Sequence, residues 1–82
     1  MVRDQYQAVV EKIIRDARHG PYAVATAPTI GTITFSLQPP VWQDADWPET
    51  GMYVVLQQIR KKRAGWRALR ARFVSPEDQQ LA

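Results

Sequence analysis

The apolar residues of this chain follow two different periods, and the change between them falls at Gly20-Pro21. Before this pair, apolar residues recur at steps of three and four. After it, they alternate with polar residues. Steps of three and four are typical of an amphipathic helix, and alternation is typical of a half-buried strand. The pattern therefore predicts an α+β fold, with one helix followed by a β region over residues 21–74.

The N-terminal segment, residues 4–18, is predicted to be helical. The apolar side chains of one stripe are Tyr6, Val9, Val10, Ile13, Ile14 and Ala17. Asp4 is placed to cap the first turn, and Gln7 completes a capping box. Gly20 followed by Pro21 gives a stop signal. Because an isolated helix of this length is marginal in water, we expect the stripe to pack on the rest of the chain.

Four strands are predicted in the β region, at residues 22–26, 32–37, 52–59 and 66–74. In the second, Ile33, Phe35 and Leu37 alternate with polar residues, as in a half-buried antiparallel strand. Residues 39–51 hold three prolines and two tryptophans. We expect this segment to be a long ordered loop, since tryptophans have reason to pack.

The stretch after Ile59 admits two interpretations. In the first it is a hairpin that turns between Lys62 and Gly65. One face of its second strand then carries Leu69, Ala71 and Phe73, and the outer face carries Trp66, Ala68, Arg70 and Arg72. In the second, residues 63–73 form a helix, because alanine, leucine and arginine favour helices. The hairpin is preferred, because a short basic turn with a glycine precedes the last apolar run.

The expected architecture is one domain over residues 1–82. An N-terminal helix packs on a small, bent, four-stranded antiparallel sheet or on a partly open barrel of the OB or SH3 kind. In the tail, residues 75–82, Ser75-Pro76 and the two acids that follow predict a short helix. The chain has 82 residues and no cysteine, so its core must hold without disulfides.

The apolar runs are far shorter than the roughly 20 residues of a membrane helix. The first residues lack the hydrophobic stretch of a secretion signal. We therefore expect a soluble, cytoplasmic protein that binds no membrane. The oligomeric state stays open.

The formal net charge of +3 is unevenly distributed. Seven of the eleven basic residues lie in one stretch without an acid: Arg60, Lys61, Lys62, Arg63, Arg67, Arg70 and Arg72. Such groups neutralise phosphates, and Trp66 and Tyr22 offer rings for stacking on bases. The sequence thus predicts a non-catalytic nucleic-acid-binding module, with RNA or single-stranded DNA as the favoured partner. The alternative is a solvated hairpin, with Trp66 as a partly buried ring that covers the barrel end.

A protein-interaction or regulatory module that docks on a larger complex is the other functional hypothesis. Trp42, Trp47 and Tyr53 lie beside an acidic segment and before the basic stretch. Tryptophan and tyrosine are enriched among the residues that dominate binding energy at interfaces. These three residues are therefore the candidate protein interface.

Three acids, Asp44, Asp46 and Glu49, lie close together in the loop. Hard cations prefer oxygen clusters, but the spacing lacks the glycine turn and ligand count of a calcium loop. A solvated loop is the favoured interpretation. A further possibility is that these acids pair with the basic hairpin and mask it.

The parts of an enzyme site are missing. His19 is the single histidine, and Ser36 and Ser75 stand in contexts that look structural. There is no glycine-rich phosphate loop. We expect no catalytic activity, no cofactor and no metal.

With the strands placed, residues 20–74 resemble a cold-shock domain. Gly51, Val54, Leu56, Gly65 and Ala68 fit the layout of that family's last hairpin. The stretches 20–24 and 33–36 fall where its two RNA-binding signatures lie. Thr34 and Ser36 replace an aromatic and a histidine of the second signature, and Tyr22 is the one aromatic that fits the first. The resemblance implies a small barrel that binds nucleic acid.

Overall fold

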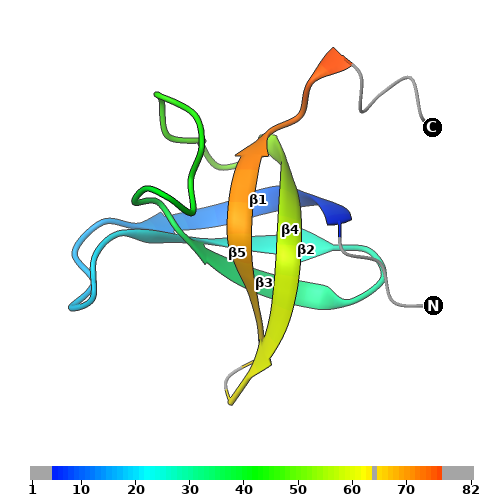
Figure 1. The fold of residues 1–82 in the computed structure, drawn as a ribbon, viewed down its shortest axis with the longest axis horizontal. Coiled ribbons are helices and arrows are strands. Elements are labelled where there is room, and N and C mark those ends of the chain that lie inside the picture. Colours follow the sequence, from blue (N-terminus) through cyan, green and yellow to red (C-terminus); the bar gives the residue numbers. More distant parts are fainter. Residues whose placement is uncertain (1–4, 64, 77–82) are drawn as a thin grey trace.

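The computed structural model describes residues 5–63 and 65–76, and every named element in those ranges is a strand. The strands are β1 (Gln5–Ile14), β2 (Tyr22–Ala27), β3 (Gly31–Ser36), β4 (Tyr53–Lys62) and β5 (Gly65–Phe73). They form a closed barrel in the order β1-β2-β3-β5-β4, with β4 returning to β1 (Figure 1). All neighbours are antiparallel except β3 and β5, which are parallel.

This layout is compatible with an OB-like barrel, which has five strands in a Greek-key arrangement. The predicted α+β class is wrong, because the structure is an all-β closed barrel. The prediction of four strands is wrong for the same reason: the segment assigned to the helix supplies the fifth strand.

β1 contains a β-bulge at Glu11. Val10 pairs with Ala25 and Lys12 pairs with Val24, so Glu11 is an extra residue in the ladder. Its carboxylate accepts a hydrogen bond from the hydroxyl of a β2 residue, Thr26. A bulge bends its strand. The bend lets the first half of β1 pair with β4 and the second half pair with β2.

The bulge explains why a helix over residues 4–18 was a wrong prediction. Ala8 and Val10 are buried two positions apart, and Ile13 packs on the core three positions later. The step of three across the bulge, from Val10 to Ile13, resembles helical spacing. Val9, Val10, Ile13 and Ile14 are β-branched, which suits a strand. Asp4, the expected cap, lies outside the described residues.

The other four strands lie within a residue or a few residues of the predicted ranges. The chain turns back between Lys62 and Gly65, so the hairpin interpretation is confirmed and the helix over residues 63–73 is wrong. In the tail, residues 77–82, most of the expected short helix, lie outside the described residues.

The two faces of the β4–β5 hairpin exchange roles halfway along. Gln58 has a left-handed backbone (φ 55°), and its pair with Leu69 is missing from an otherwise continuous register. Ala71 and Ala68 are both fully buried although they are three positions apart. Ala68 therefore faces the core, and its predicted place on the outer face was wrong. Trp66, two positions before Ala68, also packs against the core. Simple alternation does not detect such an irregularity.

Trp42 closes the end of the barrel at which the parallel strands β3 and β5 finish. It is 3% exposed, stacks on Phe35 at a centroid distance of 5.9 Å and meets Phe73 edge-on at 5.0 Å. Its indole N–H donates to the backbone oxygen of Asp46 at 2.8 Å. The Asp44 carboxylate accepts the Phe73 N–H at 2.8 Å. The loop is ordered, as predicted, because it is hydrogen-bonded to β5.

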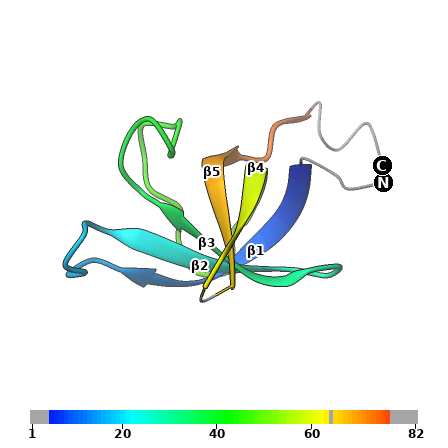
Figure 2. The same cartoon turned by 60° about the horizontal axis from the view of Figure 1, so that its bottom comes forward.

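The loop between β3 and β4 and the turn of the β4–β5 hairpin lie at opposite ends of the barrel (Figures 1 and 2). Two backbone hydrogen bonds join β5 to this loop: the Ala71 N–H donates to Val41 O at 2.9 Å, and the Gln43 N–H donates to Ala71 O at 3.0 Å.

In the described residues, no helix has the length and apolarity needed to cross a membrane.

Candidate nucleic-acid interface

A row of aligned side chains runs across all five strands on the outside of the barrel. Its members in strand order are Lys12, Val24, Thr34, Arg67 and Arg60. The flanking residues Ala23, Ala25, Ile33, Phe35 and Ala68 are fully buried, so the row itself faces outward. Three strand-to-strand steps around the barrel separate Lys12 from Arg67. Cations thus stand at both ends of the row, with Val24 and Thr34 between them.

A second row lies beside the first and carries the aromatic ring. Tyr22 of β2 pairs with Ile14 of β1 and with Ser36 of β3. Tyr22 is half-buried and lies on the same outer face as Val24. The Ser36 hydroxyl accepts the backbone N–H of Gln38 at 3.0 Å, so its own proton is left to donate. The ring is therefore bordered by an aliphatic and a hydroxyl side chain.

The segment between β1 and β2, residues 15–21, forms one wall of an open depression beside Tyr22. The depression has a volume of about 290 Å³. Its lining residues are Ala17, Arg18, His19, Gly20, Pro21, Tyr22, Thr34, Ser36 and Arg67. This volume is at the low end of the roughly 300–1,000 Å³ of small-molecule sites. The depression therefore has room for a group the size of a nucleotide base.

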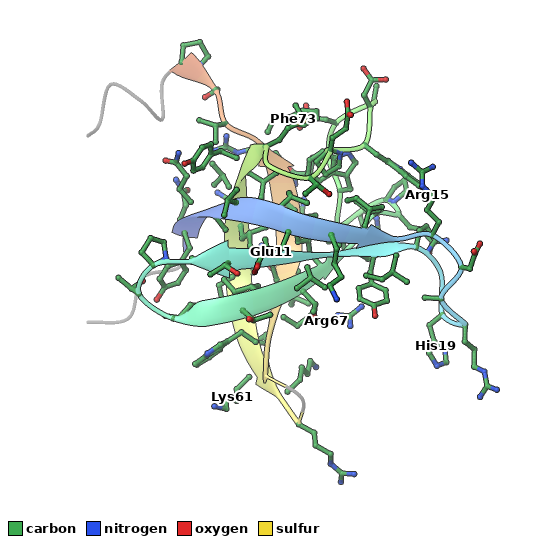
Figure 3. All side chains as sticks on the ribbon, turned by 180° about the vertical axis from the view of Figure 1, so that it is seen from behind. Glu11, Arg15, His19, Lys61, Arg67 and Phe73 are labelled. Atoms are coloured by element: carbon green, nitrogen blue, oxygen red, sulfur yellow. The ribbon has the colours of Figure 1, made fainter. Side chains whose placement is uncertain are left out.

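One backbone hydrogen bond closes a turn within that segment, and a second joins the segment to the residue after β3. The Gly20 N–H donates to Ala17 O at 3.1 Å, and the Leu37 N–H donates to Pro21 O at 3.1 Å. Gly20 has φ 101°, a conformation that favours glycine. His19 extends outward from the segment, and Arg67 lies on the barrel beside it (Figure 3). Arg18 and Arg67, two cationic side chains that are distant in sequence, thus line one depression.

The seven cations of the basic stretch do not share one surface. Arg60 and Arg67 lie directly opposite each other on the outer row. Lys62 and Arg63 are exposed at the turn. The other three lie elsewhere: Lys61 faces Trp66, Arg70 pairs with Gln57, and Arg72 pairs with Val55 further along the hairpin. Of the seven, only Arg67 lines the depression beside Tyr22.

Trp66 occupies the barrel end at which β3 and β5 begin. It is half-buried and packs against the core, and the Lys61 ammonium nitrogen lies 4.8 Å from the ring centroid. Trp66 is thus a partly buried ring that covers the barrel end. Tyr22 is the aromatic side chain that borders the outer rows.

Of the three residues expected at a protein interface, two reach the surface. Trp47 is 41% exposed and Tyr53 is 59% exposed, whereas Trp42 belongs to the core. Met52, which the sequence did not single out, is 40% exposed. The Arg15 guanidinium carbon lies 5.9 Å from the Trp47 ring centroid, so this ring already has a cation partner.

The acidic loop does not cover the turn of the basic hairpin, because the two lie at opposite ends of the barrel (Figure 1). Asp44 is bound to β5, and Asp46 and Glu49 are exposed. Within residues 5–63 and 65–76, no group of three or more histidine, cysteine or acidic residues is placed to hold a metal ion.

Sequence reasoning missed Lys12, Arg18 and His19 as members of this surface. The signal was the pair Arg18 and His19 immediately before Gly20-Pro21. At the end of the predicted helix, these residues fit a last turn, where cations are favoured. In a strand–loop–strand interpretation, the same run is a basic loop beside Tyr22.

Comparisons of the chain with protein families, with curated proteins and with solved structures found no match. The functional argument therefore depends on the geometry of the barrel surface.

Proposed function

We propose that this chain binds single-stranded nucleic acid on the outer face of β2, β3 and the start of β5. Tyr22 stacks on a base, and Lys12, Arg60 and Arg67 neutralise phosphates. The supporting observation is that Tyr22, Arg67 and residues 17–21, which include Arg18, line the same open depression.

The position on the barrel supports this proposal. OB-like barrels bind oligonucleotides on the face of their second and third strands, between the loop that joins the first two strands and the loop that joins the last two. Here the corresponding elements are residues 15–21 and the β4–β5 turn. Non-specific single-strand binders combine a cationic groove with stacking rings.

The likeness to cold-shock domains belongs to the proposal as well. Thr34 and Ser36 place hydroxyls where that family has stacking side chains, so Tyr22 is the main ring. A surface with one ring and several cations depends on phosphate contacts more than on base edges. We therefore expect weak sequence preference and strong salt dependence.

The remaining cations act at longer range. Lys62 and Arg63 at the exposed turn, with Arg70 on β5, raise the local positive potential and speed encounter with a polyanion. We expect a binding module without catalytic activity, acting in the cytoplasm.

The test is a fluorescence anisotropy titration with labelled RNA, single-stranded DNA and duplex DNA across a series of salt concentrations. We expect single strands to bind, with affinity falling as salt rises. Tyr22→Ala should weaken binding by about 5- to 150-fold, the equivalent of the roughly 1–3 kcal/mol of a stacked base. Tyr22→Phe should retain most of the affinity.

Tyr53→Ala is the matched control, because Tyr53 is an exposed tyrosine outside the two rows. It should leave the affinity unchanged. Absence of salt-dependent binding to all three nucleic acids would refute the proposed function, as would equal losses in Tyr22→Ala and Tyr53→Ala.

A second candidate function is docking on a protein, favoured by the exposure of Trp47, Met52 and Tyr53. A pull-down with nucleic acid digested away tests it. Loss of a captured partner on Trp47→Ala and Tyr53→Ala, with Tyr22→Ala unaffected, would favour docking over nucleic-acid binding.

A further inference from the structure

We infer that the bound strand does not end at the depression beside Tyr22. It crosses the β4–β5 hairpin over Arg67 and Arg60 and enters a second depression lined by glutamine amides. This inference depends on the proposed function, since it extends the same site to a ligand of several nucleotides.

The two depressions meet at one pair of arginines. Arg67 lines the depression beside Tyr22. Arg60 lines a second open depression of about 280 Å³, together with Gln5, Gln57 and Gln58. Arg60 and Arg67 are direct cross-strand neighbours on β4 and β5. The pair therefore forms the boundary between the two depressions.

Electrostatics favour an anion at this boundary. Like charges directly opposite each other on neighbouring strands are destabilising. Arg60 donates to a neutral acceptor, the backbone oxygen of Ile59, at 3.0 Å. Across the described ranges, no ion pair to a carboxylate is found for Arg60 or Arg67. A phosphate between them supplies the missing negative charge, and guanidinium groups bind phosphate in a bidentate way.

The second depression has the chemistry to contact bases. The Gln57 side-chain nitrogen donates to the Gln5 side-chain oxygen at 2.9 Å, which leaves an acceptor on Gln57 and donors on Gln5. Amides carry both donors and acceptors, as base edges do. Arg70 pairs with Gln57 across the hairpin but does not line the depression, so its charge acts at longer range.

Gln58 gives an independent reason to place a ligand here. Its φ of 55° is in the left-handed region, which costs a non-glycine residue about 1–2 kcal/mol. Its side chain is exposed, so core packing does not require it. Strained positions of this kind cluster at functional sites. A side chain that folding does not need, on the wall of an open depression, is placed to contact a ligand.

The experiment compares two lengths of oligo-dT and oligo-U, about 4 and about 10 nucleotides, within the range of roughly 4–16 nucleotides per barrel. The variants are Gln58→Gly and Gln57→Ala, and Gln43→Ala is the control because Gln43 is an exposed amide on the far loop. Gln58→Gly relieves the backbone strain, so its thermal midpoint should equal or exceed that of the original protein.

We expect both glutamine variants to bind the short oligonucleotide normally and to bind the long one about 3- to 10-fold more weakly. Tyr22→Ala should weaken binding at both lengths. If the short oligonucleotide binds but the gain with length is unchanged in both glutamine variants, this inference is wrong and the proposed function stands. If neither length binds the original protein, the proposed function itself fails.

Discussion

The ammonium nitrogen of Lys61 lies 4.8 Å from the centroid of the Trp66 ring, directly across the β4–β5 hairpin. The same indole packs against the barrel core. A base that stacked on Trp66 would have to displace Lys61 and lose the cation–π attraction, which is about 0.5–1 kcal/mol at exposed sites. The pair therefore has a structural role at the end of the barrel.

Trp66→Ala should lower the free energy of unfolding by about 2 kcal/mol, the scale of burying one large apolar side chain. Trp66→Phe should recover most of that loss and leave oligonucleotide affinity unchanged. Urea denaturation and the anisotropy titration measure the two quantities. A Trp66→Phe variant that is stable but binds much more weakly would instead assign the indole to the ligand surface.

Trp42→Ala should destabilise the protein by about 3–5 kcal/mol, because it opens a cavity between Phe35 and Phe73. It also leaves the backbone oxygen of Asp46 without its indole donor. Trp47→Ala is the matched control and should change stability by no more than about 0.5 kcal/mol. Denaturant unfolding measures both changes in stability. Similar effects of the two substitutions would contradict the structural role of Trp42 at the end of the barrel.

Arg67→Ala and Arg60→Ala should each reduce the slope of log affinity against log salt by about 0.7, the value for one phosphate contact on a single strand. The physical reason is that a variant with one phosphate contact fewer releases fewer counterions when it binds the strand. Arg15→Ala serves as the control, since its guanidinium lies over Trp47. A slope that falls equally in all three variants would indicate a diffuse field without a defined phosphate path.

Gly20→Ala should destabilise the fold by about 1–2 kcal/mol because φ 101° disfavours a side chain. It should also weaken oligonucleotide binding, since Gly20 itself lines the depression and the added Cβ, 2.9 Å from the flexible Gln38 amide, would make that side chain move. Gly31→Ala is matched: φ is 83°, and its Cβ meets nothing within 4 Å. Both variants should lose stability in thermal melts, but only Gly20→Ala should lose affinity.

Most of the β region was predictable because its signals are local. Alternation at Ile33, Phe35 and Leu37 marks β3, and the basic turn before Gly65 marks the last hairpin. These patterns depend on neighbours in sequence, so they survive without knowledge of the tertiary partners. The presence of Tyr22 and Arg67 in the candidate site was predictable in the same way.

The helix over residues 4–18 and the predicted outer face of the hairpin failed for a common reason. Each depends on one residue that breaks alternation: Glu11 in β1 and Gln58 in β4. The break in β1 is a bulge, which bends the strand where the sheet closes into a barrel. Closure is a property of all five strands together, and no local window of sequence contains it.

The sequence by itself determined the inward residues of β3, the position of the last hairpin and the supply of cations. Only the tertiary structure decided that Trp42 and Trp66 fill the two ends of the barrel, leaving Tyr22 on the outside. It also brought Arg67 and residues 17–21 together in one depression. The physical reason is that the spacing of apolar residues indicates which side chains of a strand face the core. Barrel closure decides which of the outer faces become neighbours.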